Sequence, residues 1–134
     1  MSHHDVVVIG AGPAGLAAGA CLAEMGLNVL TLDEQARVGG QIYRNMEAAP
    51  EDRRRLLGED YTHGLALAKR FRQSGAAYKS GATVWQAEPS GIVCYSQKGR
   101  SEEINSNFII VATGAMERPV PIPGWTLPGV MGAG

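Results

Sequence analysis

The chain has 134 residues, of which 45% are hydrophobic and 19% are charged, and this is the composition of one globular domain. Its 12 basic and 13 acidic residues nearly cancel, which excludes an electrostatic attraction to nucleic acid or to an acidic membrane surface. No apolar run approaches the ~20 residues that a membrane-spanning helix needs, so we expect a cytoplasmic location.

The first predicted element is a strand at 6–9, which leads directly into a glycine-rich loop at 10–15. The strand residues are all apolar and β-branched, as in a buried strand of a parallel sheet. Gly10 allows a tight turn, Gly12 lets a pyrophosphate approach the backbone, and Gly15 lets the next helix pack closely. The pattern therefore predicts a dinucleotide site. The alternative is a turn that only packs a helix on a strand.

The helix after this loop is predicted to begin at Pro13 or Ala14. Proline suits a first helical turn, because its missing N–H group is not needed there. The unpaired N–H groups and the positive end of the helix dipole would face the phosphates. An anion can therefore bind at this point without a lysine.

A second apolar run at 29–32 predicts the neighbouring parallel strand. Asp33 follows at its carboxyl end, where an acid accepts hydrogen bonds from ribose hydroxyls, and Glu34 is the second candidate for that role. A carboxylate without a nearby arginine would repel a ribose 2′-phosphate. The pattern therefore favours FAD or NAD over NADP.

The next segment, 38–44, contains the pair Gly39 and Gly40, which again allows the backbone to approach a ligand closely. The polar stretch 45–58 lacks periodicity and predicts a loop with one short helical turn. Apolar residues at helical spacing then predict an amphipathic helix over 60–74, which should cover one face of the sheet.

Strands are predicted throughout the following region. The segment 77–79 should be a third parallel strand, and 83–87, 92–96 and 102–105 are separated by turn residues, which indicates an antiparallel meander. The run 108–112 is continuous and apolar, so we expect it to return to the parallel sheet.

Histidine and cysteine residues do not suggest further chemistry. His3 and His4 have no other ligand at a suitable spacing, so we expect mobile, exposed side chains and no metal site. Cys21 and Cys94 form no C-x-x-C pair and are expected to be buried thiols.

The motifs occur in an order that resembles one family. The loop 10–15, Asp33, and the segments 39–44, 112–115 and 119–130 are similar to the FAD-dependent pyridine nucleotide-disulfide oxidoreductase superfamily. Within it, the chain most resembles the flavoprotein subunits of opine oxidase, hydrogen cyanide synthase and related amine or proline dehydrogenases.

The resemblance implies that the cofactor is FAD. Gln41 would continue the glycine-pair loop along the cofactor, Val84 would meet the adenine through its backbone, and Thr113 with Gly114 would form a second flavin-contacting turn. The complete set of expected cofactor-binding residues is Gly10, Gly12, Pro13, Ala14, Gly15, Asp33, Glu34, Gly39, Gly40, Gln41, Val84, Thr113 and Gly114.

The expected fold is α/β, a Rossmann-like parallel sheet with helices and an inserted antiparallel meander. Residues 1–117 would form the N-terminal part of an FAD-binding domain, and the proline-rich 118–134 a connector toward a nicotinamide domain that the chain lacks. Members of the family return from that domain to complete the FAD domain, so the FAD-binding domain here is expected to be incomplete.

The resemblance also implies a reaction. A secondary amine or an amino-acid-like substrate, such as an opine, proline or a glycine-like compound, would transfer a hydride to FAD. Electrons would pass on through a second flavoprotein or iron–sulfur subunit. The flavin accepts the hydride itself, so we assign no catalytic residue.

Two other functions stay open. The chain could be a non-catalytic, truncated or split module that needs a partner chain or self-association, or a small NAD-binding protein. The glycine pair and the turn at 112–114 weigh against NAD.

Overall fold

Six strands form a single sheet in the order β3-β2-β1-β6-β5-β4. The computed structural model describes residues 2–116 and 118–131. The elements are β1 (Ser2–Ile9), α1 (Pro13–Glu24), β2 (Val29–Asp33), α2 (Glu51–Leu57), α3 (Glu59–Gln73), β3 (Ala77–Ser80), β4 (Ala82–Ala87), β5 (Ile92–Gln97) and β6 (Arg100–Val111). The predicted α/β class, with its parallel sheet and inserted meander, is confirmed.

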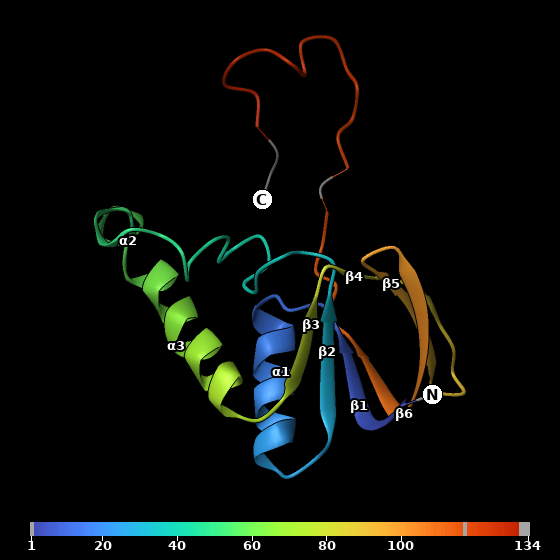
Figure 1. Cartoon of the computed structure of the whole chain (residues 1–134). Helices are drawn as coiled ribbons and strands as arrows, with labels where there is room; N and C mark the ends of the chain where they lie inside the picture. The colour runs from blue at the N-terminus through green and yellow to red at the C-terminus, as the bar shows by residue number, and fades with distance from the viewer. Residues whose placement is uncertain (1, 117, 132–134) are drawn as a thin grey trace.

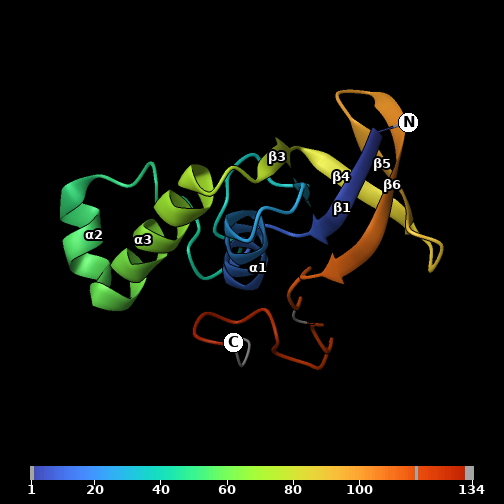
Figure 2. The same cartoon turned by 90° about the horizontal axis from the view of Figure 1, so that it is seen from below.

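The parallel part of the sheet is centred on β1. This strand pairs in parallel with β2 on one side and β6 on the other, with Val7 opposite both Leu30 and Ile109. β3 adds to β2, also in parallel. Figures 1 and 2 show α1 and α3 on one side of these strands and the β4–β5 hairpin on the other. Both faces of β1 and β2 are therefore covered, which explains their continuous apolar sequences.

The antiparallel meander is present, but its last strand differs from the prediction. We expected separate strands at 102–105 and 108–112, whereas β6 is one strand of 12 residues. Its first half pairs with β5 and its second half with β1. Polar Ser106 does not interrupt it, because its backbone N–H and its hydroxyl both donate to the carbonyl of Gly91, at 2.9 and 3.1 Å.

Two expectations about the N-terminal histidines and the cysteines are corrected. β1 begins at Ser2, and His3 and His4 pair with β6, so these histidines are held in the sheet rather than mobile. Cys94 is buried as expected, whereas Cys21 is exposed because it lies on the outer side of α1. The predicted loop at 45–58 also differs from the structure, because it contains α2, a helix of 7 residues, in place of one short helical turn.

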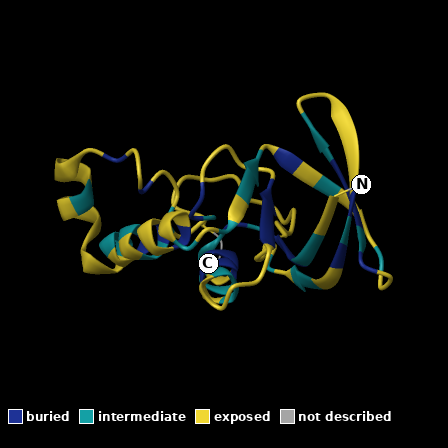
Figure 3. Cartoon of the chain, turned by 60° about the horizontal axis from the view of Figure 1, so that its bottom comes forward, coloured by how far each residue is buried: buried dark blue, intermediate teal, exposed yellow. Residues whose placement is uncertain are grey.

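Two apolar layers stabilise the fold. Between the parallel strands and the meander lie Val7, Ile9, Leu30, Leu32, Ala82, Val93, Tyr95 and Ile104. On the other face of the sheet, Val6, Val8 and Val29 pack against Leu22 and Ala23 of α1. A further cluster joins α1, α3 and the adjoining loops, and its buried members are Ala11, Leu16, Ala20, Val38, Met46, Ala68 and Phe71. Figure 3 shows the buried positions along the central strands and mostly exposed positions over α2. Among the described residues, no helix combines the length and apolarity needed to cross a membrane.

A polar cluster links the edge strand β3 to β5 and β6. Lys79 on β3 donates to the hydroxyl of Tyr95 on β5 and, at 2.9 Å, to the carboxylate of Glu102 on β6. Tyr95 also donates to Glu102, at 2.5 Å. Because β3 and β5 are not neighbours in strand order, these bonds require the sheet to curl around its inner core.

Tyr78 predicts a specific pH dependence of stability. Its hydroxyl is buried and has no hydrogen-bond partner among the described residues, and burial raises its pKa from 10.0 to about 12. The folded state therefore retains the proton more strongly than the unfolded state. The resulting stability is present below pH 10.0 and is lost as the pH rises toward about 12.

We expect Tyr78→Phe to remove the loss of folding stability at high pH, because phenylalanine has no proton to release. Near neutral pH the variant should differ from the wild type by no more than about 1 kcal/mol, because the deleted hydroxyl makes no hydrogen bond. As the pH rises above 10.0, the variant should gain stability relative to the wild type. Urea unfolding of both proteins at a series of pH values measures the difference, and a constant difference would contradict the assignment.

Candidate dinucleotide-binding site

Three loops meet at the carboxyl ends of β1, β2 and β6, toward the top of Figure 1. The phosphate loop, 10–15, follows β1 and is joined to both neighbouring strands. The N–H of Gly10 donates to the carbonyl of Leu32 at 2.7 Å, and the N–H of Ala112 donates to the carbonyl of Ile9 at 2.8 Å. This is the edge at which α/β sheets bind nucleotides.

Two of the three motif glycines are required by the packing of the protein itself. Gly10 has a φ of +105°, and a Cβ atom there would lie 2.3 Å from the carbonyl oxygen of Ala112. A Cβ atom on Gly15 would lie 1.8 Å from the carbonyl oxygen of Gly10. Neither position can hold a side chain without displacing the backbone.

Gly12 differs from the other two. Its φ is −72°, which any residue can adopt. Apart from its chain neighbours, the described residues bring one atom within 4 Å of a Cβ built there, the Cα of Gly40, at 3.8 Å. Gly12 is also the N-cap of α1 and is followed by Pro13, as predicted. Among the described residues, the first turn has no acidic residue and no side-chain cap, so the first N–H groups of α1 lack an intrahelical partner. This arrangement suits an anion that approaches the backbone closely.

The glycine pair lies against the phosphate loop. The N–H of Gly39 donates to the carbonyl of Ala11 at 2.8 Å. Gly40 has a φ of +62°, and a Cβ atom there would lie 3.0 Å from the Cα of Gly12. The two glycine loops therefore form one continuous backbone surface.

The α3 helix holds the segment after the glycine pair. Met46 is fully buried, and its sulfur and the ring of Tyr43 lie over Gly64, where a Cβ atom would be 2.6 Å and 2.5 Å from them. The hydroxyl of Tyr61 donates to the carbonyl of Arg44 at 2.8 Å. An ion pair with a separation of 3.0 Å joins Glu47 to Arg72 and raises the pKa of the arginine.

The two candidate ribose acids have different surroundings. Asp33 is buried, and its oxygens accept hydrogen bonds from the backbone N–H groups of Ala11, at 2.5 Å, and Gln35, at 2.7 Å. Glu34 is exposed, and its side chain accepts one long bond, 3.4 Å, from the amide of Gln35. Both acids lie at the carboxyl end of β2, where nucleotide-binding sheets place the acid that meets a ribose.

The structure joins most of the other predicted residues. The amide of Gln41 donates to the carbonyl of Ala115 at 3.0 Å, which connects the glycine-pair loop with the turn that contains Thr113 and Gly114. Val84 lies on β4, where it packs against the core cluster that includes Ile9 and Leu32, beside a β-bulge between Val84 and Gln86. Sequence reasoning missed the roles of Ala11, Gln35 and Ala115, because backbone groups carry no residue signature.

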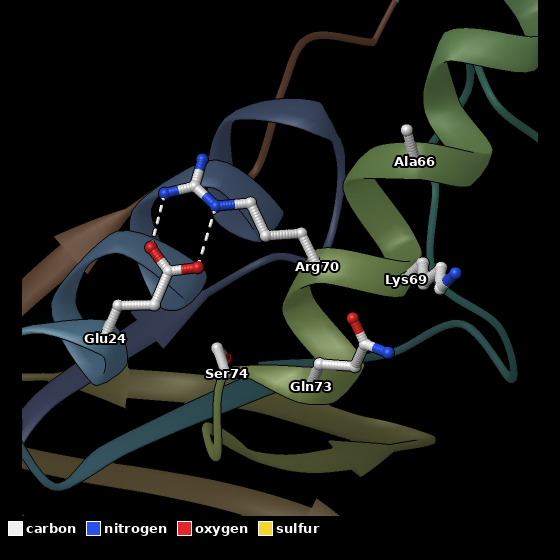
Figure 4. Close-up of a pocket in the computed structure, with 6 residues that line it drawn as sticks. All are labelled: Glu24, Ala66, Lys69, Arg70, Gln73 and Ser74. Carbon is white, nitrogen blue, oxygen red and sulfur yellow. Dashed lines mark hydrogen bonds and ion pairs between the residues drawn. The ribbon is translucent and has the colours of Figure 1, made fainter.

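A separate surface hollow of about 430 Å³ lies between the last turn of α1 and α3 (Figure 4). Its main contact is a bidentate pair in which Arg70 donates to Glu24 at 2.8 and 2.6 Å and lowers the pKa of that carboxyl. The hollow is at the opposite end of α1 from Gly12. We therefore interpret the ion pair in it as a structural contact between α1 and α3 and not as part of the nucleotide site.

Within residues 2–116 and 118–131, no three histidine, cysteine or acidic side chains gather as a metal site would require.

The fold and the three loops define an α/β dinucleotide-binding protein of the Rossmann type. The chain belongs to the pyridine nucleotide-disulphide oxidoreductase family, which matches residues 4–132. The resemblance expected from the sequence is thereby confirmed, and it supports FAD as the cofactor.

Relatives and solved structures agree with this assignment. The chain is 46% identical to an opine oxidase subunit of Agrobacterium tumefaciens (strain Ach5), over 98% of the chain and 28% of that protein. It is 35% identical to the HcnB subunit of hydrogen cyanide synthase from Pseudomonas aeruginosa, over 93% of the chain and 27% of the relative. The L-proline dehydrogenase of P. horikoshii has the same fold, with a TM-score of 0.66 and 20% identity over 88% of the chain and 24% of that structure. The chain thus spans about a quarter of each.

We predict opposite effects for two glycine variants. Gly12→Val should fold normally, since its φ and surroundings accept a side chain, but it should lose detectable binding of FAD and ADP. Gly15→Val should instead lose about 2 kcal/mol or more of stability, because its side chain would overlap the backbone. Thermal unfolding and ligand titration of both variants test this. Normal ADP binding by Gly12→Val would contradict the position of the phosphates.

Proposed function

We propose that the chain is the FAD-binding part of an oxidoreductase that oxidises a secondary amine or an amino-acid-like substrate. The main support is the open space at Gly12, where an uncapped helix N-terminus meets the glycine pair. The kind of substrate is inferred from the 46% identity to a protein of opine oxidase.

Each predicted residue has a defined part in this proposal. The phosphate loop binds the pyrophosphate, with Pro13 and Ala14 opening the helix that faces it. Asp33 accepts the ribose hydroxyls, with Glu34 as the second candidate for that role. The residues Gly39, Gly40 and Gln41 run along the cofactor, and Val84 and the 113–114 turn meet its two ends. Bound FAD supplies the hydride acceptor, and the residues of the chain bind and orient it.

We further propose that 1–117 is the nucleotide domain and 118–134 a connector to another domain. Residue 117 and residues 132–134 lie outside the described part of the chain. The residues 118–131 are exposed throughout and extend beyond the carboxyl ends of the strands (Figure 1).

More polypeptide is proposed to cover β6. Over 107–111 this strand pairs only with β1 among the described residues, and Phe108 and Val111 are about 70% exposed. An unpaired apolar edge favours association. The relatives are named as subunits, so the covering chain could be the remainder of a longer protein or a partner in the cytoplasm, such as a second flavoprotein or an iron–sulfur subunit.

A second candidate function is a non-catalytic module that needs such a partner. The observation that favours it is that the chain spans only 28% of the opine oxidase relative. The two proposals differ in whether flavin bound to this chain can be reduced by an amine.

The test is a titration of the purified chain with FAD, in which flavin fluorescence reports binding. We expect saturable binding of FAD. ADP should compete with FAD and riboflavin should not, because the proposed contacts are mainly to the ADP part of the cofactor. Anaerobic addition of an opine or proline should then bleach the visible flavin band. Bound flavin that stays oxidised with every amine would favour the non-catalytic module. Tighter binding of NAD than FAD would contradict the cofactor assignment.

A further inference from the structure

The first residues of the turn after β6 are held by the phosphate loop. The N–H of Ala112 donates to the carbonyl of Ile9 at 2.8 Å. A Cβ atom on Gly10 would lie 3.2 Å from the Cα of Thr113, so the two backbones are in close contact. The start of the turn is therefore fixed relative to the sheet.

The next residue, Gly114, is the point at which the chain can change direction. Its φ is +73°, a conformation that favours glycine, and apart from its chain neighbours no described atom lies within 4 Å of a Cβ built there. In the described part of the chain, the backbone hydrogen bonds of 118–131 all lie within that segment. A rotation about Gly114 would therefore swing the connector relative to the sheet (Figure 1).

One side-chain hydrogen bond opposes that rotation. The amide of Gln41 donates to the carbonyl of Ala115, directly after Gly114, at 3.0 Å. Gln41 follows Gly40, which lies against Gly12 of the phosphate loop. Among the described residues, this is the last hydrogen bond along the chain that joins the start of the connector to the rest of the protein. The bond thus ties the exit of the chain to the backbone surface proposed for the cofactor.

We propose that Gln41 is a positioning residue, whose bond to Ala115 sets the direction in which the chain leaves the nucleotide domain, and that bound cofactor strengthens this bond. The second part rests on the proposed function. A cofactor that lies along the glycine pair restricts the backbone beside Gln41, so less entropy is lost when the amide bonds to Ala115. The orientation of the connector would then depend on whether the cofactor is bound.

Two spin labels, at positions 21 and 116, measure the exit direction. Cys21 is exposed on α1, and Met116→Cys provides the second site at a residue that is 89% exposed. Cys94→Ala removes the other thiol, which is buried. Double electron–electron resonance gives the distribution of distances between the labels. This labelled parent is compared with Gln41→Met, which keeps the size of the side chain without a donor, and with Ile42→Ala, a matched control at the neighbouring exposed residue.

Without ligand, we expect one main distance in the labelled parent and in Ile42→Ala. In Gln41→Met, the ratio of this population to all other distances should fall about fivefold, the effect of losing one hydrogen bond. The distances themselves separate this effect from a general loss of stability, which circular dichroism of the same samples would detect. A distribution in Gln41→Met that matches the parent would overturn the role of Gln41.

Saturating FAD tests the coupling to the cofactor. FAD should increase the share of the main distance in the labelled parent and leave the distribution in Gln41→Met nearly unchanged. An equal response in both proteins, or no response in a parent that has bound FAD, would contradict the coupling. If the parent does not bind FAD, the proposed function fails, whereas the comparison without ligand still decides whether Gln41 holds the exit of the chain.

Discussion

The site depends on how closely three backbone segments approach one another at the ends of the parallel strands. Gly10 lies against the carbonyl of Ala112, Gly15 lies against the carbonyl of Gly10, and Gly40 lies against Gly12. At each contact a Cβ atom would be 3.0 Å or less from backbone. The loops therefore form a surface of peptide groups, and such a surface can face a polyanion with N–H donors and little side-chain bulk.

The rest of the fold keeps these segments in place. The strands β1 and β2 are buried on both faces, by α1 on one side and by the meander on the other. The α3 helix adds a second support, because its residues Tyr61, Gly64 and Arg72 hold the segment after the glycine pair. The chain therefore assembles this backbone surface from elements that are far apart in sequence.

Much of this arrangement was predictable from the sequence because its signals are local. Glycine spacing, a β-branched strand and a proline at the first helical turn each reflect a constraint within a few residues, and the structure contains all three. The long strand β6 was not predictable in the same way. Its polar centre at Ser106 resembles a turn, but Ser106 pairs with His4 of β1 and donates to the carbonyl of Gly91 in a loop 15 residues earlier, so the strand continues. The hydrogen bonds of Asp33 were not predictable from the sequence either, because its partners are backbone N–H groups, which every residue type except proline carries.

The three motif glycines are subject to two kinds of constraint, one from the packing of the protein and one from the space that a ligand needs. Gly10 and Gly15 are explained completely by the protein, because each would clash with its own backbone if it carried a side chain. Gly12 is not, since its backbone conformation is ordinary and the space beside it is open. A glycine in such a position costs backbone entropy without any gain in packing. This is what the proposed phosphate site predicts, since the open space beside Gly12 adjoins the uncapped N-terminus of α1, which favours an anionic group.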